Sequence, residues 1–317
     1  MADLKSKTED AMNESRIMIL GGQVLIGSAY RLFFMHDFQT VSPKLQLLLT
    51  GGLGAMLLVF GALLLPAAYH QITERGVDSV DVILIANGMT RCTLIVFAAA
   101  LASFLAFAFD RVLGTAASIA AALFTFVSAV SLWYIVPISA KDQAHRHDRR
   151  LELEKQQQSE SKEKKRMTSL DEKIKTALIE CRMVLPGAQA LLGFELVTML
   201  EQGFSELPSI ERIIHIAALL SIALATMTLM APAAFHRLAE HGENTGRMYH
   251  FTSRMLLSSL VLLGLGISAD FQVVLQKMTQ SYPVSVSIAG CLLALFYLLW
   301  FGYTLWKRRE IVTEAAS

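Results

Sequence analysis

Residues 14–27 of the chain read ESRIMILGGQVLIG, and residues 180–193 read ECRMVLPGAQALLG, so one pattern returns at an offset of 166 residues. Without a gap, the same offset aligns Leu65–His70 with Ala231–His236. Of the 63 residues from 14 to 76, 16 are identical to their counterparts. Similarity over such a length indicates that two copies of one unit are fused in the chain.

The composition of the chain is typical of a membrane protein. Apolar residues make up 54% of the 317 residues and charged residues only 17%. The runs 45–69, 112–136 and 213–235 contain no Asp, Glu, Lys or Arg, and about 20 such residues are needed for a helix to cross the hydrocarbon core. Uninterrupted apolar runs exclude the alternating pattern of a membrane barrel. The sequence therefore predicts an all-α polytopic membrane protein.

The apolar runs predict eight transmembrane helices, arranged as two parallel four-helix repeats. They span residues 17–34, 45–69, 80–109, 112–136, 183–200, 213–235, 255–275 and 283–306. With the N-terminus in the cytoplasm, 23 Lys and Arg residues fall on the cytoplasmic side and 5 on the other, so both termini are expected to be cytoplasmic. Four spans per unit give both units the same orientation, and we expect a pseudo-two-fold axis along the membrane normal.

The repeat predicts two membrane units separated by a charged segment. The first unit covers residues 1–140, a cytoplasmic linker covers 141–168, and the second unit covers 169–317. Residues 141–179 contain no Gly or Pro, so this stretch is either a polar helical extension or a disordered linker. Ser169 and Glu172 have the spacing of a capping box, which predicts a helix start at the second unit.

In the first span of each unit, polar residues and a glycine recur at intervals of seven and eleven residues. They are Arg16, Gln23 and Gly27 in the first unit, and Arg182, Gln189 and Gly193 in the second. At about 100° per residue these positions share one helical face. An amide in hydrocarbon needs a bonding partner or water, so we expect an interior face. It either lines a pathway for a solute or ion, or forms a dry contact between helices.

A second set of polar residues recurs at the cytoplasmic ends of the spans and forms a candidate collar. It comprises Glu14, His70 and Arg91 in the first unit, and Glu180, His236 and Arg254 in the second. We expect a glutamate to pair with Arg91 or Arg254 and to fix the helix ends. Structural anchoring and an anion-binding role both remain open for this set.

The two collar histidines are candidate ligands of a haem or a metal. Equal depth of His70 and His236 would suit a bis-imidazole haem or a metal. A helix C-terminus already favours a histidine through its dipole, and no second ligand pair lies deeper in the bilayer. We therefore expect no cofactor and no metal site.

Two charges lie deep in their spans and differ between the units. Arg31 aligns with Val197, and Glu195 aligns with Ala29. Both lie near the outer ends of their helices, so we expect their side chains to extend to the membrane surface.

No constellation of residues indicates catalysis. The sequence contains no Gly-rich phosphate loop, no His-Glu-x-x-His, no Gly-x-Ser-x-Gly and no paired carboxylates within one span. The net charge of +1 gives no indication of a nucleic-acid partner. Its three cysteines lack the spacing of a disulfide framework or zinc site. We expect a protein that is not an enzyme.

The segments Glu180–Phe194 and Ala231–Arg237 resemble a family of small bacterial four-span membrane proteins of unknown function. The chain is similar to two such units fused end to end. Its first copy departs from the family pattern at Leu20, where the family has proline, and at Ser28, where it has phenylalanine. The resemblance implies a bacterial inner-membrane location and suggests that single-unit relatives pair as dimers. It implies no substrate, cofactor or catalytic residue.

Three functional classes follow from these patterns. The first is permeation or sensing of a small solute or ion through the polar face. The second is a structural or regulatory membrane protein that acts through its cytoplasmic linker. The third is a membrane redox protein that uses His70 and His236. We favour the first, with the lipid bilayer, a small solute or a second copy of the chain as expected partners.

Overall fold

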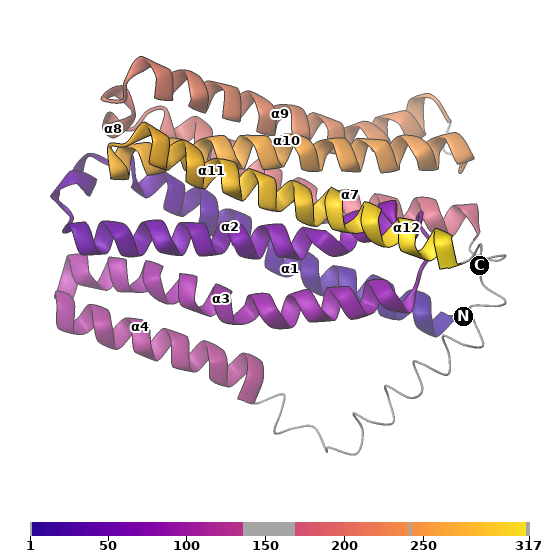
Figure 1. Ribbon diagram of the computed structural model, residues 1–317, viewed down its shortest axis with the longest axis horizontal. Coiled ribbons are helices and arrows are strands. Elements are labelled where there is room, and N and C mark those ends of the chain that lie inside the picture. Colours follow the sequence, from indigo (N-terminus) through magenta and orange to yellow (C-terminus); the bar gives the residue numbers. More distant parts are fainter. Residues whose placement is uncertain (1, 136–168, 241–242, 315–317) are drawn as a thin grey trace.

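The computed structural model describes residues 2–135, 169–240 and 243–314. The predicted linker, 141–168, lies outside these described residues. The long helices run side by side along one axis (Figure 1). The helices of the first repeat are α1 (Ala2–Leu32), α2 (Pro43–Ile72), α3 (Val80–Leu113) and α4 (Thr115–Val130), with a short helix η1 (His36–Thr40) and a π-helical end η2 (Ser131–Ile135).

The second repeat has the same order of helices. It comprises α7 (Leu170–Thr198), the one-turn helix α8 (Gln202–Ser205), α9 (Ser209–Leu238), α10 (Gly246–Thr279), α11 (Tyr282–Tyr297), the π-helical η3 (Leu298–Tyr303) and α12 (Thr304–Glu314). The regular structure of the described residues is entirely helical, which confirms the predicted all-α class.

Within the described part of the chain, seven helices are long and apolar enough to cross a membrane. The first predicted span, residues 17–34, falls almost entirely in the second half of α1, the helix that packs against α7, α2 and α3. It is not among the seven, because Arg16, Gln23 and Arg31 lower the hydropathy of this stretch. The chain is thus an all-α polytopic membrane protein, and α1 is the most polar of its long helices in the described residues.

Side-chain caps fix several helix starts. The predicted capping box is present: Ser169 Oγ accepts from the Glu172 amide, and the Glu172 carboxylate accepts from the Ser169 amide. Ser79 caps α3 and Thr245 caps α10, and these two residues lie 166 positions apart. Such caps satisfy amide groups that the first helical turn leaves free. The repeats therefore begin their third helices by the same device.

The two repeats have the same internal packing. In the first repeat, α1 packs on α2 and α3, α2 on α3, and α3 on α4. In the second, α7 packs on α9 and α10, α9 on α10, and α10 on α11. This common pattern is the structural counterpart of the repeated sequence.

The repeats meet mainly where α1 packs on α7, and this contact is not two-fold. On α1 the contact uses Gln23 and Gly27; on α7 it uses Gly187 and Phe194. Gly187 and Phe194 align with Gly21 and Ser28, which lie on nearly the opposite side of the helix from Gln23 and Gly27. A two-fold axis would require equivalent faces on both helices. The predicted pseudo-two-fold is therefore wrong: the repeats pack head to tail, through different faces of their first helices.

A second inter-repeat contact follows from this arrangement. The C-terminal segments η3 and α12, together with α10, pack on α2 of the first repeat. Trp300 is fully buried there, stacks on Phe296 and donates its indole N–H to the Gly61 carbonyl at 2.7 Å. Trp133, in the corresponding π-helical segment η2, instead meets the edge of Phe97 within its own repeat. In Figure 1, α4 lies at the outer margin, next to α3.

Gly27 and its counterpart Gly193 give a direct test of the head-to-tail contact. A Cβ on Gly27 would lie 2.8 Å from Phe194 Cγ, so Gly27→Ala is expected to destabilise the fold by about 1–3 kcal/mol through overpacking. A Cβ on Gly193 would meet nothing within 4 Å. Gly193→Ala is expected to leave stability unchanged or raise it by up to about 1 kcal/mol through helix propensity. Detergent-micelle unfolding followed by circular dichroism measures both, and equal losses would contradict this contact.

Candidate functional site

Four buried polar side chains from four helices meet at the end of the bundle where α8 lies. They are Tyr30 of α1, Glu195 of α7, His215 of α9 and Asp270 of α10, each at most 5% exposed. Tyr30 donates its hydroxyl to Asp270 Oδ1 at 3.0 Å. His215 Nδ1 lies 2.8 Å from the same oxygen and 3.0 Å from the Tyr30 hydroxyl. We call these residues the His215 cluster.

Aromatic rings close one side of the His215 cluster. The Tyr30 ring stacks on His215, with centroids 5.8 Å apart. Phe204 of α8 meets the His215 ring edge-on at 5.0 Å. The short helix α8 lies in the connection between α7 and α9, so this connection places an apolar cover over the histidine.

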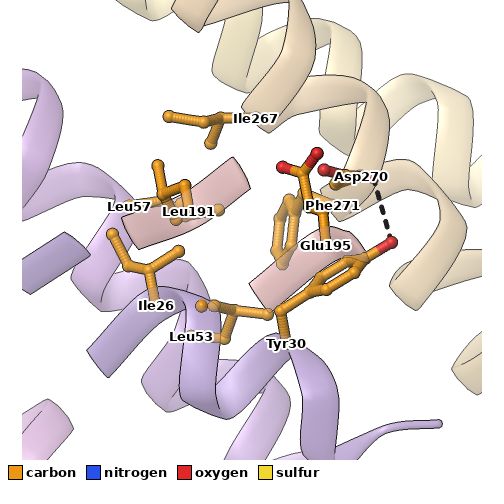
Figure 2. Close-up of a pocket in the computed structure, with 10 residues that line it drawn as sticks. Ile26, Tyr30, Leu53, Leu57, Leu191, Glu195, Ile267, Asp270 and Phe271 are labelled. Atoms are coloured by element: carbon orange, nitrogen blue, oxygen red, sulfur yellow. Dashed lines mark hydrogen bonds between the residues drawn. The ribbon is translucent and has the colours of Figure 1, made fainter. Parts of the chain in front are cut away.

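A small cavity opens beside the cluster, between the two repeats. Figure 2 shows the Glu195 and Asp270 carboxyl groups close together, with the hydroxyl of Tyr30 pointing to Asp270. The cavity is lined by Ile26, Gly27, Tyr30, Leu53, Leu57, Leu191, Glu195, Ile267, Asp270 and Phe271. Its volume of about 20 Å³ is enough for roughly one water molecule.

The polar groups of the cluster are incompletely bonded. Among the described residues, Glu195 Oε2 and His215 Nε2 have no hydrogen-bond partner. Two carboxyl groups, an imidazole and a phenol within bonding distance can hold a proton and pass it from one group to the next. The same part of the chain holds no group of three or more His, Cys, Asp or Glu side chains suited to a metal ion.

A second buried cluster joins α2 of the first repeat to α7 of the second. His70 Nδ1 and Glu180 Oε1 lie 2.6 Å apart, and Gln71 donates to Glu180 Oε2. His70 and Glu180 are fully buried. The other ring nitrogen of His70 lies 3.9 Å from Asp78. We call His70, Gln71 and Glu180 the Glu180 cluster.

Gln23 lies between the two clusters along the α1–α7 contact. It is fully buried against Gly187, and neither its amide nitrogen nor its amide oxygen has a partner in the described chain. Gly187 lies seven residues after Glu180 and eight before Glu195, which corresponds to about 10 and 12 Å along the helix axis. The Glu180 cluster, Gln23 and the His215 cluster thus form a line of buried polar groups, which we call the polar seam.

The structure separates the residues of the predicted polar face. Gln23 is interior, as expected, whereas Gln189 is exposed. Arg16 and Arg182 are also exposed. The face cannot be interior in both copies, because the head-to-tail contact buries opposite faces of α1 and α7.

Of the predicted collar, the structure brings only His70 and Glu180 together. It places Glu14, Arg91 and Arg254 at exposed positions and leaves His236 half-buried. Glu180 bonds to His70 and Gln71, so the expected pairing of this glutamate with Arg254 is wrong. The two histidines also differ in their surroundings: His70 has a carboxylate partner at the repeat contact, whereas His236 is half-buried.

The two deep charges behave differently from one another. Arg31 reaches Glu201 at 2.7 Å in a partly exposed ion pair that joins the repeats. Glu195 does not extend to the surface as predicted but points into the buried cluster.

Sequence reasoning missed Tyr30, His215 and Asp270 as site residues. An acid and a histidine inside apolar runs were the available signal, since such groups in a span usually have a partner or a function. The search for paired carboxylates within one span could not find Glu195 and Asp270, because they lie on different helices.

Comparison with known proteins gives one result. The sequence model of a family of unknown function, DUF6328, matches the chain twice, over residues 4–137 and 161–304. The two matches correspond to the two repeats. No curated protein and no solved structure matches the chain.

Proposed function

Since the chain belongs to the DUF6328 family, whose function is unknown, we propose a function from the polar seam. The protein conducts protons across the membrane, along the contact between its two repeats. It is a membrane protein without enzymatic activity. The observation that carries the proposal is the His215 cluster, in which Glu195 and Asp270 lie with a histidine and a tyrosine inside the bundle. Ionisable groups in such a position are typical of proton relays.

The size of the cavity favours a proton over a larger solute. A space for about one water molecule does not admit an organic molecule, whereas a proton needs only hydrogen-bonded groups and water. The imidazole of His215 and the hydroxyl of Tyr30 can each donate one hydrogen bond and accept another, so each can receive a proton on one side and release one on the other. The proposal therefore narrows the expected small solute or ion to the proton.

The remainder of the polar seam supports a route across the bundle. Gln23, about midway between the two clusters, has a donor and an acceptor that no described residue bonds. Buried amides in this state are commonly bridged by water. Glu180 and His70 complete the line at the other end of α7. Entry of a few water molecules along the α1–α7 contact would connect these groups.

Location and orientation are part of the same proposal. The excess of Lys and Arg on one side, 23 against 5, supports cytoplasmic N- and C-termini. The resemblance noted in the sequence supports the inner membrane of a bacterium. In this orientation the Glu180 cluster lies near the cytoplasmic side and the His215 cluster near the outer side.

Proton flux in reconstituted vesicles tests the proposal. Purified protein is placed in liposomes loaded with a pH-sensitive dye, and a potassium gradient with valinomycin drives proton uptake. We expect flux above that of empty liposomes. Glu195→Gln and Gln23→Leu should each lower this flux about tenfold, because each removes a proton-carrying or water-binding group from the relay.

The matched control is Glu206→Gln. Glu206 is an exposed carboxylate near the same end of the bundle, outside the polar seam, so its removal should leave flux unchanged. Absence of wild-type flux, or equal flux in Glu195→Gln, would refute proton permeation.

One observation favours a second function, that of a structural membrane protein. Both clusters join residues from opposite repeats, so they also fasten the repeats together. In that case Glu195→Gln would lower the thermal stability of the protein in detergent while wild-type vesicles stay proton-tight. The flux and stability measurements together separate the two functions.

A further inference from the structure

One side of the contact between the repeats is a stripe of α7 with a seven-residue spacing. Glu180 meets His70 and Gln71, Gly187 meets Gln23, and Phe194 meets Gly27. The corresponding stripe of α1 is Glu14, Gly21 and Ser28. Glu14 is exposed, and a Cβ on Gly21 would meet nothing within 4 Å. The first repeat thus presents the same stripe that the second repeat uses to hold the first, with Glu14 exposed and Gly21 and Ser28 half-buried.

The receiving side of the contact is also repeated and uncovered. In the first repeat it consists of Gln23, Gly27 and His70, all buried. The corresponding residues of the second repeat are Gln189, Gly193 and His236. Gln189 and Gly193 are exposed, and no described residue bonds the buried Nε2 of His236.

From this equivalence we infer that a second copy of the chain docks head to tail, with its α1 stripe on the uncovered face of α7 and α9. Glu14 of one copy meets His236 of the next, and Gly21 receives Gln189. The junction between copies repeats the junction between repeats. It is continuous with an interface already present inside each chain, which is why the occupant is another copy rather than an unrelated protein.

Charge and polarity support this occupant. Glu180 is held by His70 and Gln71, and Gln71 aligns with Arg237. Between copies, Glu14 would therefore face a histidine and an exposed arginine, which adds an ion pair. Gln189 is exposed in the apolar part of α7, where hydrocarbon disfavours an amide that lacks a hydrogen-bond partner. Docking against Gly21 encloses this amide as Gln23 is enclosed within the chain.

The second helix of each repeat shows the same contrast. Gly54 and Gly61 of α2 lie against Phe271 and Phe296 of the second repeat. Their counterparts on α9, Leu220 and Met227, are 58% and 60% exposed. In the docked pair, α9 is covered by the first repeat of the next copy. Because a head-to-tail contact leaves one free face at each end, further copies extend the assembly into a ring or a row.

Cysteine cross-linking between copies tests the inference. Two forms of the full chain are made in which Cys92, Cys181 and Cys291 are replaced by Ala. One carries Gly21→Cys and the other Gln189→Cys, with different affinity tags, and both are expressed in the same membrane. A head-to-tail contact predicts cross-links between the two forms upon mild oxidation and none between identical forms.

The fold of the cysteine variants is checked within one chain. Gln23→Cys and Gly187→Cys together should cross-link inside a monomer, since these positions are in contact. As a negative control, a chain with Gly21→Cys is paired with a chain that carries Ile95→Cys. Ile95 is exposed on α3, away from the proposed junction, so these two chains should give no cross-link. Cross-links between identical forms would indicate a two-fold dimer. Absence of any cross-link in chains that pass the fold check would indicate that the copies do not associate through these faces. Either result would overturn the inference.

A mass measurement gives a second, independent reading. In lipid nanodiscs or native mass spectrometry, the wild-type chain should be larger than a monomer. Gly21→Trp and Gly193→Trp block the two sides of the junction and should each raise the dissociation constant at least about tenfold, as bulky groups do at a close contact. A monomeric wild type, or oligomers unaffected by both substitutions, would contradict the inference.

Discussion

Glu180→Ala is expected to lower the free energy of unfolding by about 3 kcal/mol, because removal of one partner strands the other groups of a buried network. Glu180 is fully buried and is the shared acceptor for His70 and Gln71 across the repeat contact. Without it, both side chains lose their acceptor in a place closed to bulk water. Unfolding of the monomer by SDS titration, followed by circular dichroism, measures the change.

Glu14→Ala is the matched control for this prediction. Glu14 is the repeat counterpart of Glu180 but is exposed in the single chain. Its removal should change the stability of the monomer by less than about 0.5 kcal/mol, as for other exposed positions. Equal losses for the two variants would show that the Glu180 cluster does not fasten the repeats.

Trp300→Ala is expected to destabilise the protein by about 2–4 kcal/mol, since it leaves a large cavity at a contact between the repeats. Trp300 also donates a hydrogen bond to the Gly61 carbonyl and stacks on Phe296. In a membrane protein the loss comes mainly from packing, because lipid is as apolar as the interior. The same SDS titration measures it.

Trp133→Ala is the matched control, because it removes a tryptophan side chain that does not lie at the contact between the repeats. Trp133 lies in the equivalent π-helical segment but is only half-buried and contacts Phe97 of its own repeat. We expect a loss below about 1.5 kcal/mol, as for partly buried side chains. If Trp133→Ala proved as damaging as Trp300→Ala, the asymmetric packing of the two repeats would be refuted.

The sequence predicted the helices well because hydropathy and caps are local signals. It placed the helix that became α10 at residues 255–275, whereas the helix runs from Gly246 to Thr279. Hydropathy marks only the apolar middle, and the cap at Thr245 lies outside it. The span predicted at 283–306 is helical too, but its backbone hydrogen bonds change from the α-helical to the π-helical pattern at η3. The pattern of apolar residues does not encode this change.

The relation between the repeats could not be predicted from the same patterns. Gly21 and Gly27 both offered α1 a face for close packing, and both recur in the second unit. Which glycine is used depends on the side chain it meets: Gly27 receives Phe194, and the counterpart of Phe194 is the smaller Ser28. This difference is visible only once the two helices are placed together.

The site was predicted in part, for a related reason. Gln23, His70 and Glu180 were singled out because they recur, and the structure buries all three. Tyr30, His215 and Asp270 do not recur and were missed. Repetition finds residues that both units need, whereas each residue of the His215 cluster is found in one unit without an identical counterpart in the other.

The acid and the histidine of the His215 cluster occur in the second repeat and are not repeated in the first. Glu195 aligns with Ala29, and His215 aligns with Leu49, so a pair of identical units would carry either two such acids and histidines or none. Two fused copies can differ in sequence, and here only the second carries this acid and this imidazole. In the described part of the chain, such a cluster of acid and imidazole therefore occurs once, where a symmetric dimer of identical units would carry two or none.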